Sequence, residues 1–209
     1  RYFFLPNYPP KALYQENHIQ HTLATDKVKL LYQGVIAPGH GLEELIPLLG
    51  QKIAGRSLML TLLGLVTEKY ANAISELAEQ HNVLDKVVFL ERQAYHSLPG
   101  ISGSYDIGLA IHRVEGHIYS TGGTASNKIY EYAASALPVI LFDHEQYRKY
   151  LKKHDWAFFT DLTPSTINTC ISDILSNYDT LSQKAFASFN DELNYEQQFD
   201  NVYNQIVYE

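Results

Sequence analysis

Apolar, strand-length runs that alternate with helical patterns constrain this fold more than any other feature of the sequence. Four such runs are Val28–Gly34, Ser57–Gly64, Lys86–Leu90 and Tyr105–His112. Amphipathic stretches of helical length separate several of them, and continuously apolar strands in this arrangement are typical of parallel sheets covered on both faces. The sequence therefore predicts an α/β domain with a doubly wound, Rossmann-like parallel sheet.

Further segments complete the predicted order of elements. "GLEELIPLLGQK" has apolar residues at helical spacing after the first strand, and "TEKYANAISELAEQHN" has Thr67 as a candidate N-cap after the second. "LPVILF" and "WAFFT" predict two more strands, separated by a helix from about Glu145 to Lys152. Two or three helices are expected from Thr163 onwards. The total is about six strands followed by carboxy-terminal helices.

Composition excludes several classes of function. The formal net charge of −7 argues against nucleic acid as a partner, because phosphate backbones are bound by clustered Lys and Arg. Cys170 is the only cysteine, so a disulfide framework is excluded and a reducing, cytoplasmic compartment is favoured. His18 and His21 lack the further ligands of a metal centre, and no metal site is predicted.

The stretch "SNKIYEYAASALPVI" predicts a helix leading into a buried strand, with an unusual polar start. Ser126 or Asn127 can cap the helix. Lys128 is unexpected there, because the helix dipole disfavours a cation at the amino-terminal end unless an anion lies nearby. Glu131 lies on the same face and could accept hydrogen bonds from vicinal hydroxyls such as those of a ribose. The simpler explanation is a capped helix with a surface Lys–Glu pair.

The first strand-to-helix turn, "GVIAPGHG", has the glycine spacing of a phosphate-binding loop, with Gly34 and Gly39 at the two glycine positions. His40 and Gly41 stand where that motif requires Lys and Ser or Thr, so a P-loop nucleoside triphosphatase is not predicted. The bare backbone amides of such a turn could bind an anion. Alternatively, the glycines only make a tight turn.

Other ligand candidates follow two more predicted strands. Arg92 and Tyr95 come after Lys86–Leu90, where a base could rest. The glycine-containing loop from Arg113 to Ala125 carries Arg113, Glu115 and His117, which are candidates for sugar hydroxyls or phosphate. Ordinary surface positions explain these residues equally well.

Taken together, "LLYQGVIAPGHGLEELIPLL" and, about ninety residues later, "ASNKIYEYAASALPVI" resemble the carboxy-terminal half of GT-B glycosyltransferases. The likeness covers roughly residues 27–175. It is strongest to the large retaining family, group 1 or family 4, that builds bacterial polysaccharides and glycolipids. "LPNYP" is similar to the interdomain connection of these enzymes. The resemblance implies that residues 1–26 are such a connection, that 27–209 form the donor-binding domain, and that an amino-terminal acceptor domain is absent.

The resemblance also implies roles for individual residues. Glu131 matches the glutamate that binds the ribose hydroxyls of the nucleotide, and Gly123 stands where the E-x7-E pattern expects another glutamate. Lys128, with the backbone around Ser126 and Asn127, would face the diphosphate. His40 occupies the place of a family Arg or Lys beside it. Lys128 and His40 are thus the predicted catalytic residues. The predicted donor-binding residues are Gly34, Gly39, Gly41, Arg92, His117, Gly123, Ser126, Asn127 and Glu131.

The resulting functional hypothesis is a metal-independent glycosyltransferase, retaining if it follows its family, without a cofactor. Its donor would be a UDP-sugar or GDP-sugar, and its acceptor a glycan or lipid-linked sugar bound by the missing domain. The fragment alone is expected to bind nucleotide but to transfer no sugar. A cytoplasmic location is expected, with peripheral attachment to the inner face of the membrane as an option for the full-length protein. A sugar-nucleotide epimerase and a non-catalytic nucleotide-binding module are the alternatives.

Overall fold

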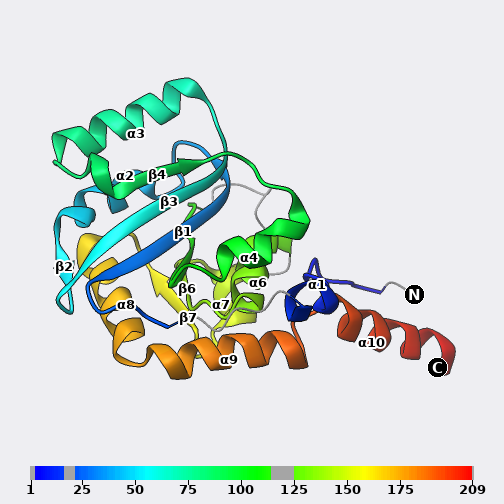
Figure 1. The fold of residues 1–209 in the computed structure, drawn as a ribbon. Helices are drawn as coiled ribbons and strands as arrows, with labels where there is room; N and C mark the ends of the chain where they lie inside the picture. The colour runs from blue at the N-terminus through cyan, green and yellow to red at the C-terminus, as the bar shows by residue number, and fades with distance from the viewer. Residues whose placement is uncertain (1–2, 17–21, 114–124, 209) are drawn as a thin grey trace.

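The fold was analysed in a computed structural model that describes residues 3–16, 22–113 and 125–208, with the side chain of Tyr208 left out. Its centre is a seven-stranded sheet (Figure 1). The strands are β1 (Lys27–Ile36), β2 (Lys52–Ile53), β3 (Arg56–Val66), β4 (Val87–Leu90), β5 (Ile107–Ala110), β6 (Val139–Phe142) and β7 (Ala157–Thr160). All pair in parallel except β2, which is a short antiparallel strand beside the start of β3.

The parallel strands lie in the order β4-β3-β1-β5-β6-β7. Numbered along the chain, this is the 3-2-1-4-5-6 order of the Rossmann fold, so the direction of winding reverses between β1 and β5. The predicted doubly wound parallel sheet of about six strands is confirmed. Ligands of such sheets bind outside the carboxyl ends of the strands at the reversal. The ends of β1, β3 and β4 are therefore the place to examine.

Helices cover both faces of the sheet. They are α1 (Lys11–Glu16), α2 (Leu42–Leu45), α3 (Glu68–Gln80), α4 (Leu98–Ser102), α6 (Asn127–Ala134), α7 (Glu145–Leu151), α8 (Pro164–Ser176), α9 (Tyr178–Asp191) and α10 (Tyr195–Tyr208). One core cluster joins β1 and β3 to α2, α3 and α8, and the other joins the sheet to α6, α7 and α9. Alternate residues of β1 serve the two clusters: Leu30 and Tyr32 belong to the first, and Leu31 to the second.

The predicted helix in "GLEELIPLLGQK" is only partly right. Helix α2 has four residues and continues as a 3₁₀-helix, Ile46–Gly50. Pro47 has no backbone N–H to donate to an α-helical turn, and Gly50 lies at the end of the segment. The apolar residues are nevertheless buried as their spacing predicts, because α2 and the 3₁₀-helix both contribute to the first core cluster.

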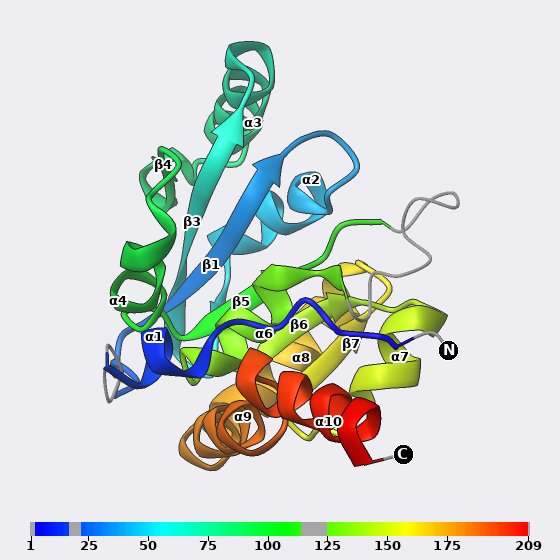
Figure 2. The same ribbon diagram turned by 90° about the vertical axis from the view of Figure 1, so that its right-hand side faces the viewer.

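The chain before β1 lies against the rest of the domain. Residues 3–10 form neither strand nor helix and run across α6 (Figure 2), where the Tyr8 and Tyr130 ring centroids are 4.3 Å apart. Helix α1, which the sequence did not predict, buries Tyr14 against Phe189 of α9, with ring centroids 5.7 Å apart. The amide of Lys11 donates to Glu196 of α10 at 2.7 Å. These contacts bring both ends of the described chain to the same side of the molecule.

Candidate functional site: a cavity at the switch point

A cavity of about 470 Å³ lies at the carboxyl ends of β1, β3 and β4 and at the start of α6. Side chains of mixed character line it. Its polar lining comprises Gln33, Arg92, Gln93, Ser126, Asn127, Lys128 and Glu131, and its apolar lining comprises Val35, Leu63, Leu65, Tyr95 and Leu98. Gly34 and Gly64 complete the wall. The cavity has the volume and mixed lining of a small-molecule site.

Two paired glycines shape the floor where β1 and β3 end. Gly34 and Gly64 are neighbours in the parallel register, and a Cβ built on Gly64 would stand only 1.9 Å from the Gly34 carbonyl oxygen. A Cβ on Gly34 would lie 3.4 Å from Nζ of Lys128. Both glycines have positive φ, 121° and 145°. The approach of the two strands therefore requires glycine at position 64, and the positive φ favours glycine at both positions, whereas a Cβ on Gly34 would make only ordinary van der Waals contact with Lys128.

Helix α6 begins without the side-chain cap that the simpler explanation of its sequence requires. Ser126 holds the N-cap position, but its side chain forms no capping hydrogen bond with any described residue. Asn127 instead accepts a hydrogen bond from the Asn7 side chain in the amino-terminal segment. By contrast, α3, α7 and α8 all begin with a side-chain cap, supplied by Thr67, His144 and Thr163. The start of α6 thus differs from that of these three helices, whereas α4 and α9 also begin without a side-chain cap.

Lys128 and Glu131 are not an exposed surface pair. Glu131 is 4% exposed, and burial raises its pKa to about 7, although Gln33 and Lys128 oppose the shift. Lys128 is half-buried, and desolvation lowers its pKa to about 8, with Glu131 acting in the opposite direction. Both groups are therefore held where the fold alone disfavours their charged forms. Such shifts are frequent at functional sites, although structural networks also produce them.

His40 does not line the cavity, but the hydroxyl of Tyr32 links it to Lys128, which does. Its Nδ1 is 2.6 Å from the hydroxyl of Tyr32 and 2.9 Å from the carbonyl oxygen of Val35. The Lys128 ammonium donates to the same Tyr32 hydroxyl at 3.3 Å and lies 4.4 Å from the centre of its ring. Burial and then Lys128 lower the pKa of His40, so the imidazole is mostly neutral at pH 7.

The loop glycines Gly39 and Gly41 do not line the cavity. Both have positive φ, 78° and 76°. The carbonyl of Gly39 accepts from the amide of Arg113 at 3.1 Å, and a Cβ on Gly41 would come within 2.7 Å of the Ile111 carbonyl oxygen. These glycines therefore hold the loop closely against the segment after β5, which is the tight-turn explanation of the motif.

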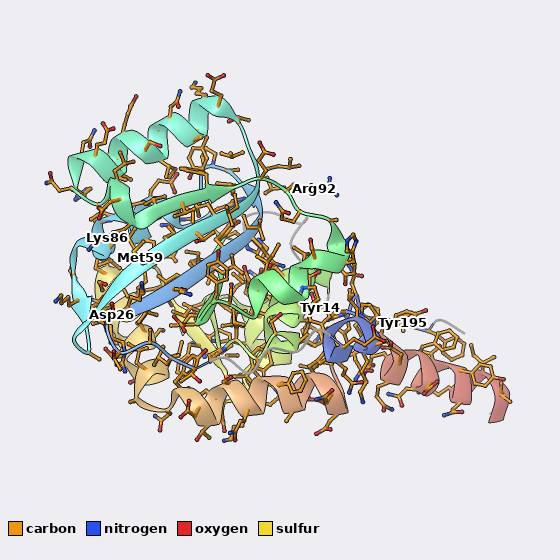
Figure 3. The ribbon with its side chains drawn as sticks, in the orientation of Figure 1. Tyr14, Asp26, Met59, Lys86, Arg92 and Tyr195 are labelled. Atoms are coloured by element: carbon orange, nitrogen blue, oxygen red, sulfur yellow. The ribbon has the colours of Figure 1, made fainter. Side chains whose placement is uncertain are left out.

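The remaining predicted residues divide into three groups. Arg92, at the end of β4, is exposed on the cavity wall, and Figure 3 shows it projecting from that strand end. Arg113 forms an ion pair with Glu44 of α2 rather than lining the cavity. His117, Gly123 and Glu115 lie outside the described residues. The structure thus brings Gly34, Arg92, Ser126, Asn127, Lys128 and Glu131 to the wall of one cavity, together with Tyr95; their roles in binding a donor stay predictions.

Sequence reasoning missed Gln33, the buried polar residue of the site. It is 5% exposed, and its side-chain amide donates to the Glu131 carboxylate. The only signal was a polar residue inside the otherwise apolar run "KLLYQG". Within the described residues, no group of three or more His, Cys, Asp or Glu side chains is placed to hold a metal ion. None of the described helices combines the length and apolarity of a membrane span.

No protein-family model matches the sequence, and no curated protein matches it significantly. Solved structures do match. WaaG, a glycosyltransferase involved in lipopolysaccharide biosynthesis, is 17% identical with a TM-score of 0.66 over 97% of this chain and 55% of WaaG. Anabaena HepE, solved with UDP and glucose, is 14% identical with a TM-score of 0.67 over 88% of this chain and 49% of HepE. A glycosyltransferase from Rickettsia africae ESF-5 is 14% identical, with a TM-score of 0.70 over 96% and 56%.

This chain spans about half the length of each of these proteins. At such low identities the likeness establishes a shared fold. The strand order, the cavity at the switch point and these neighbours agree with the motifs found in the sequence. The chain has the fold of the carboxy-terminal half of a GT-B glycosyltransferase.

Proposed function

We propose that this chain is the donor-binding domain of a glycosyltransferase that uses a UDP-sugar or a GDP-sugar. The observation that carries the proposal is the start of α6. There, a helix amino terminus without a side-chain cap from the described chain and the ammonium group of Lys128 face a cavity at the switch point. The partial positive charge of the helix end and that of Lys128 repel each other, and a diphosphate would relieve both.

The cavity lining divides in a way that fits the parts of such a donor. The first turn of α6 and Lys128 would hold the diphosphate. Glu131, one helical turn deeper, would accept hydrogen bonds from the ribose hydroxyls. Leu65 and Tyr95 offer apolar surface for the base, with Arg92 at its edge. HepE, of similar fold, was solved with UDP and UDP-glucose, which supports this assignment.

In the proposed reaction, the bond between the sugar and the diphosphate breaks and an acceptor hydroxyl takes the sugar. Negative charge then develops on the departing diphosphate. Lys128 and the amides of the first turn would stabilise that charge from fixed positions, which is electrostatic catalysis without a metal. His40, mostly neutral, would act through the Tyr32 hydroxyl that contacts both it and Lys128. In this scheme His40 helps to position the ammonium group.

The acceptor, a glycan or lipid-linked sugar, would bind to an amino-terminal domain on the other side of the donor cavity. On its own, this 209-residue chain would then bind nucleotide without transferring sugar. Synthesis of polysaccharide or glycolipid at the cytoplasmic side of a membrane, with retention of the anomeric configuration, is the setting we propose. Incubation of the purified 209-residue chain with a labelled UDP-sugar and glycan acceptors checks the inactivity, and any transfer would contradict it.

Calorimetric titration with UDP and GDP tests the proposal. We expect one of them to bind the wild-type chain, and Glu131→Ala to weaken it by about 1–3 kcal/mol, the size of a lost hydrogen bond to a charged group. The replacement Glu79→Ala, on the outer face of α3, is the matched control and should leave binding unchanged. If neither nucleotide binds, or if Glu131→Ala binds as well as wild type, the assignment of this cavity is wrong.

A further inference from the structure

Gln33 precedes Gly34 near the carboxyl end of β1, and it faces the layer that contains α4 and α6. Its backbone amide donates to the hydroxyl of Tyr132 at 2.8 Å. Its side-chain carbonyl accepts from the hydroxyl of Ser102 on α4 at 3.2 Å. Its side-chain NH₂ therefore points the other way, and it donates to Oε2 of Glu131. Both ends of the amide are thus occupied, and only one orientation satisfies all these bonds.

The three side chains form a chain of hydrogen bonds across three elements: Ser102 on α4, Gln33 on β1 and Glu131 on α6. All are almost inaccessible to solvent, with exposed fractions of 0%, 5% and 4%. An amide buried in this position costs desolvation, and an aliphatic side chain would pack there at lower cost. The cost is explained if the Gln33 amide serves to donate a hydrogen bond to the buried carboxylate of Glu131.

We propose that Gln33 is a positioning residue for donor binding: its amide fixes one oxygen of Glu131 and leaves the other directed at the ribose hydroxyls. The inference rests on the proposed donor-binding function. An ionised Glu131 can only accept hydrogen bonds, so the NH₂ group of the amide faces it, and the Ser102 hydroxyl donates to the amide carbonyl on the other side. The hydrogen bond also favours the ionised carboxylate, which is the form that can accept two ribose hydroxyls.

The titratable groups around Glu131 come from several elements. Lys128 on α6 favours its ionised form. Tyr14 on α1, Tyr95 before α4 and Tyr132 on α6 also interact with its charge, and their own pKa values lie above the usual value. These tyrosines stay neutral near pH 7. Within this environment, Gln33 and Lys128 are the groups that oppose the effect of burial on Glu131.

The test is a pH titration of the Glu131 carboxyl carbon, followed by NMR in wild type and in Gln33→Met. The Glu131 signal is assigned by its absence in Glu131→Gln. Methionine is similar in length and cannot donate to the carboxylate. We expect the midpoint to move to higher pH by about one unit, because the bond that favours the ionised form is lost. Gln183→Met, at an exposed position of α9, should leave it unchanged. An unchanged midpoint in a folded Gln33→Met variant would overturn the proposal, whether or not nucleotide binds.

A second readout separates this inference from the proposed function. The affinity for UDP or GDP is compared with the affinity for the same nucleotide lacking both the 2′- and 3′-hydroxyls. The ratio of the two affinities reports the contribution of the ribose hydroxyls, because contacts with the diphosphate are common to both ligands. At pH 7.5 we expect this ratio to fall about tenfold in Gln33→Met, the size of one lost hydrogen bond. Ser102→Ala should lower it less, because the amide NH₂ still donates to Glu131 and only the partner of the amide carbonyl is lost. If wild type binds nucleotide and the ratio is unchanged in Gln33→Met, the positioning role is wrong. If wild type binds neither nucleotide, the proposed function fails instead.

Discussion

Helices α3 and α6 both begin at the ligand-binding edge of the sheet, but their first turns are built in opposite ways. At α3, Thr67 accepts from the Tyr70 amide at 3.3 Å and Glu68 follows, so the cap and the charge both suit the helix dipole. At α6, Ser126 makes no such bond within the described chain, and the first turn contains Lys128 without an acidic residue. The second arrangement opposes helix stability, which indicates a requirement other than folding.

The largest expected difference between these two helix starts concerns Lys128 and Lys69, which both occupy the second helical position. Lys128→Ala should weaken UDP or GDP binding by about 2–3 kcal/mol, roughly 30- to 160-fold, because a charge-assisted hydrogen bond is lost. Lys69→Ala, on the exposed side of α3, should change binding by less than about twofold. Calorimetric titration measures both. Equal effects of the two replacements would break the comparison.

Glu131→Gln should stabilise the fold at high pH. The folded-state pKa of Glu131, about 7, lies above its ordinary value of 4.5, so the native state holds its proton more tightly than the unfolded state. Stability is therefore lost as pH rises from about 4.5 to 7, and above that range the ionised group costs on the order of 3 kcal/mol.

Urea unfolding at pH 5 and pH 8 measures this effect. The variant should be more stable than wild type at pH 8, with a much smaller difference at pH 5. Glu68→Gln in the first turn of α3 provides the contrast, because Glu68 is exposed and interacts favourably with the helix dipole. It should be slightly less stable than wild type. A Glu131→Gln variant that is less stable than wild type at pH 8 would contradict the account.

Nucleotide affinity should depend on pH through the same two side chains. Above about pH 8, Lys128 loses its proton in the free protein, and affinity should fall about tenfold by pH 9. Below about pH 7, protonated Glu131 accepts ribose hydrogen bonds poorly, and affinity should fall again. Titrations from pH 6 to 9 should show a maximum between 7 and 8. Lys128→Ala should lack the alkaline decrease and Glu131→Gln the acidic one.

The smallest expected effects concern the two cap positions themselves. Thr67→Ala should cost about 1 kcal/mol of unfolding free energy, because it removes a helix cap, and should leave nucleotide binding unchanged. Ser126→Ala should change stability by less than about 0.5 kcal/mol, since there is no capping bond to a described residue to lose. Thermal and urea unfolding of both variants decide this. A larger loss in Ser126→Ala than in Thr67→Ala would mean that Ser126 caps α6 after all.

The sheet could be predicted from sequence because its strands are buried on both faces and so appear as apolar runs. The start of α6 could be predicted because Lys128 violates the helix dipole locally. Pairing of Gln33 with Glu131 could not be predicted, since the two residues are 98 positions apart and meet only once β1 and α6 pack together. Helix α4 was missed because Pro99 and Gly100 lie inside it and indicate a loop.

Gly39 and Gly41 are a second case in which the sequence alone could not distinguish between two explanations. Their spacing resembles a phosphate-binding loop, and the sequence left open whether they bind an anion or only turn the chain. The position of Ile111, which decides the matter for Gly41, depends on how β5 pairs with β1. Local patterns thus identify polar groups that are out of place, whereas contacts between distant segments require the folded structure.

The most direct test of the central claim is amide chemical-shift mapping of the ¹⁵N-labelled chain during titration with UDP and GDP. The account predicts that the largest changes occur at Asn127, Lys128 and Ile129, in the first turn of α6, and at Gly34. The amides of Glu68 to Tyr70, in the first turn of α3, should stay unchanged. If the nucleotide binds and the α6 amides do not respond, the polar start of this helix is not a diphosphate site.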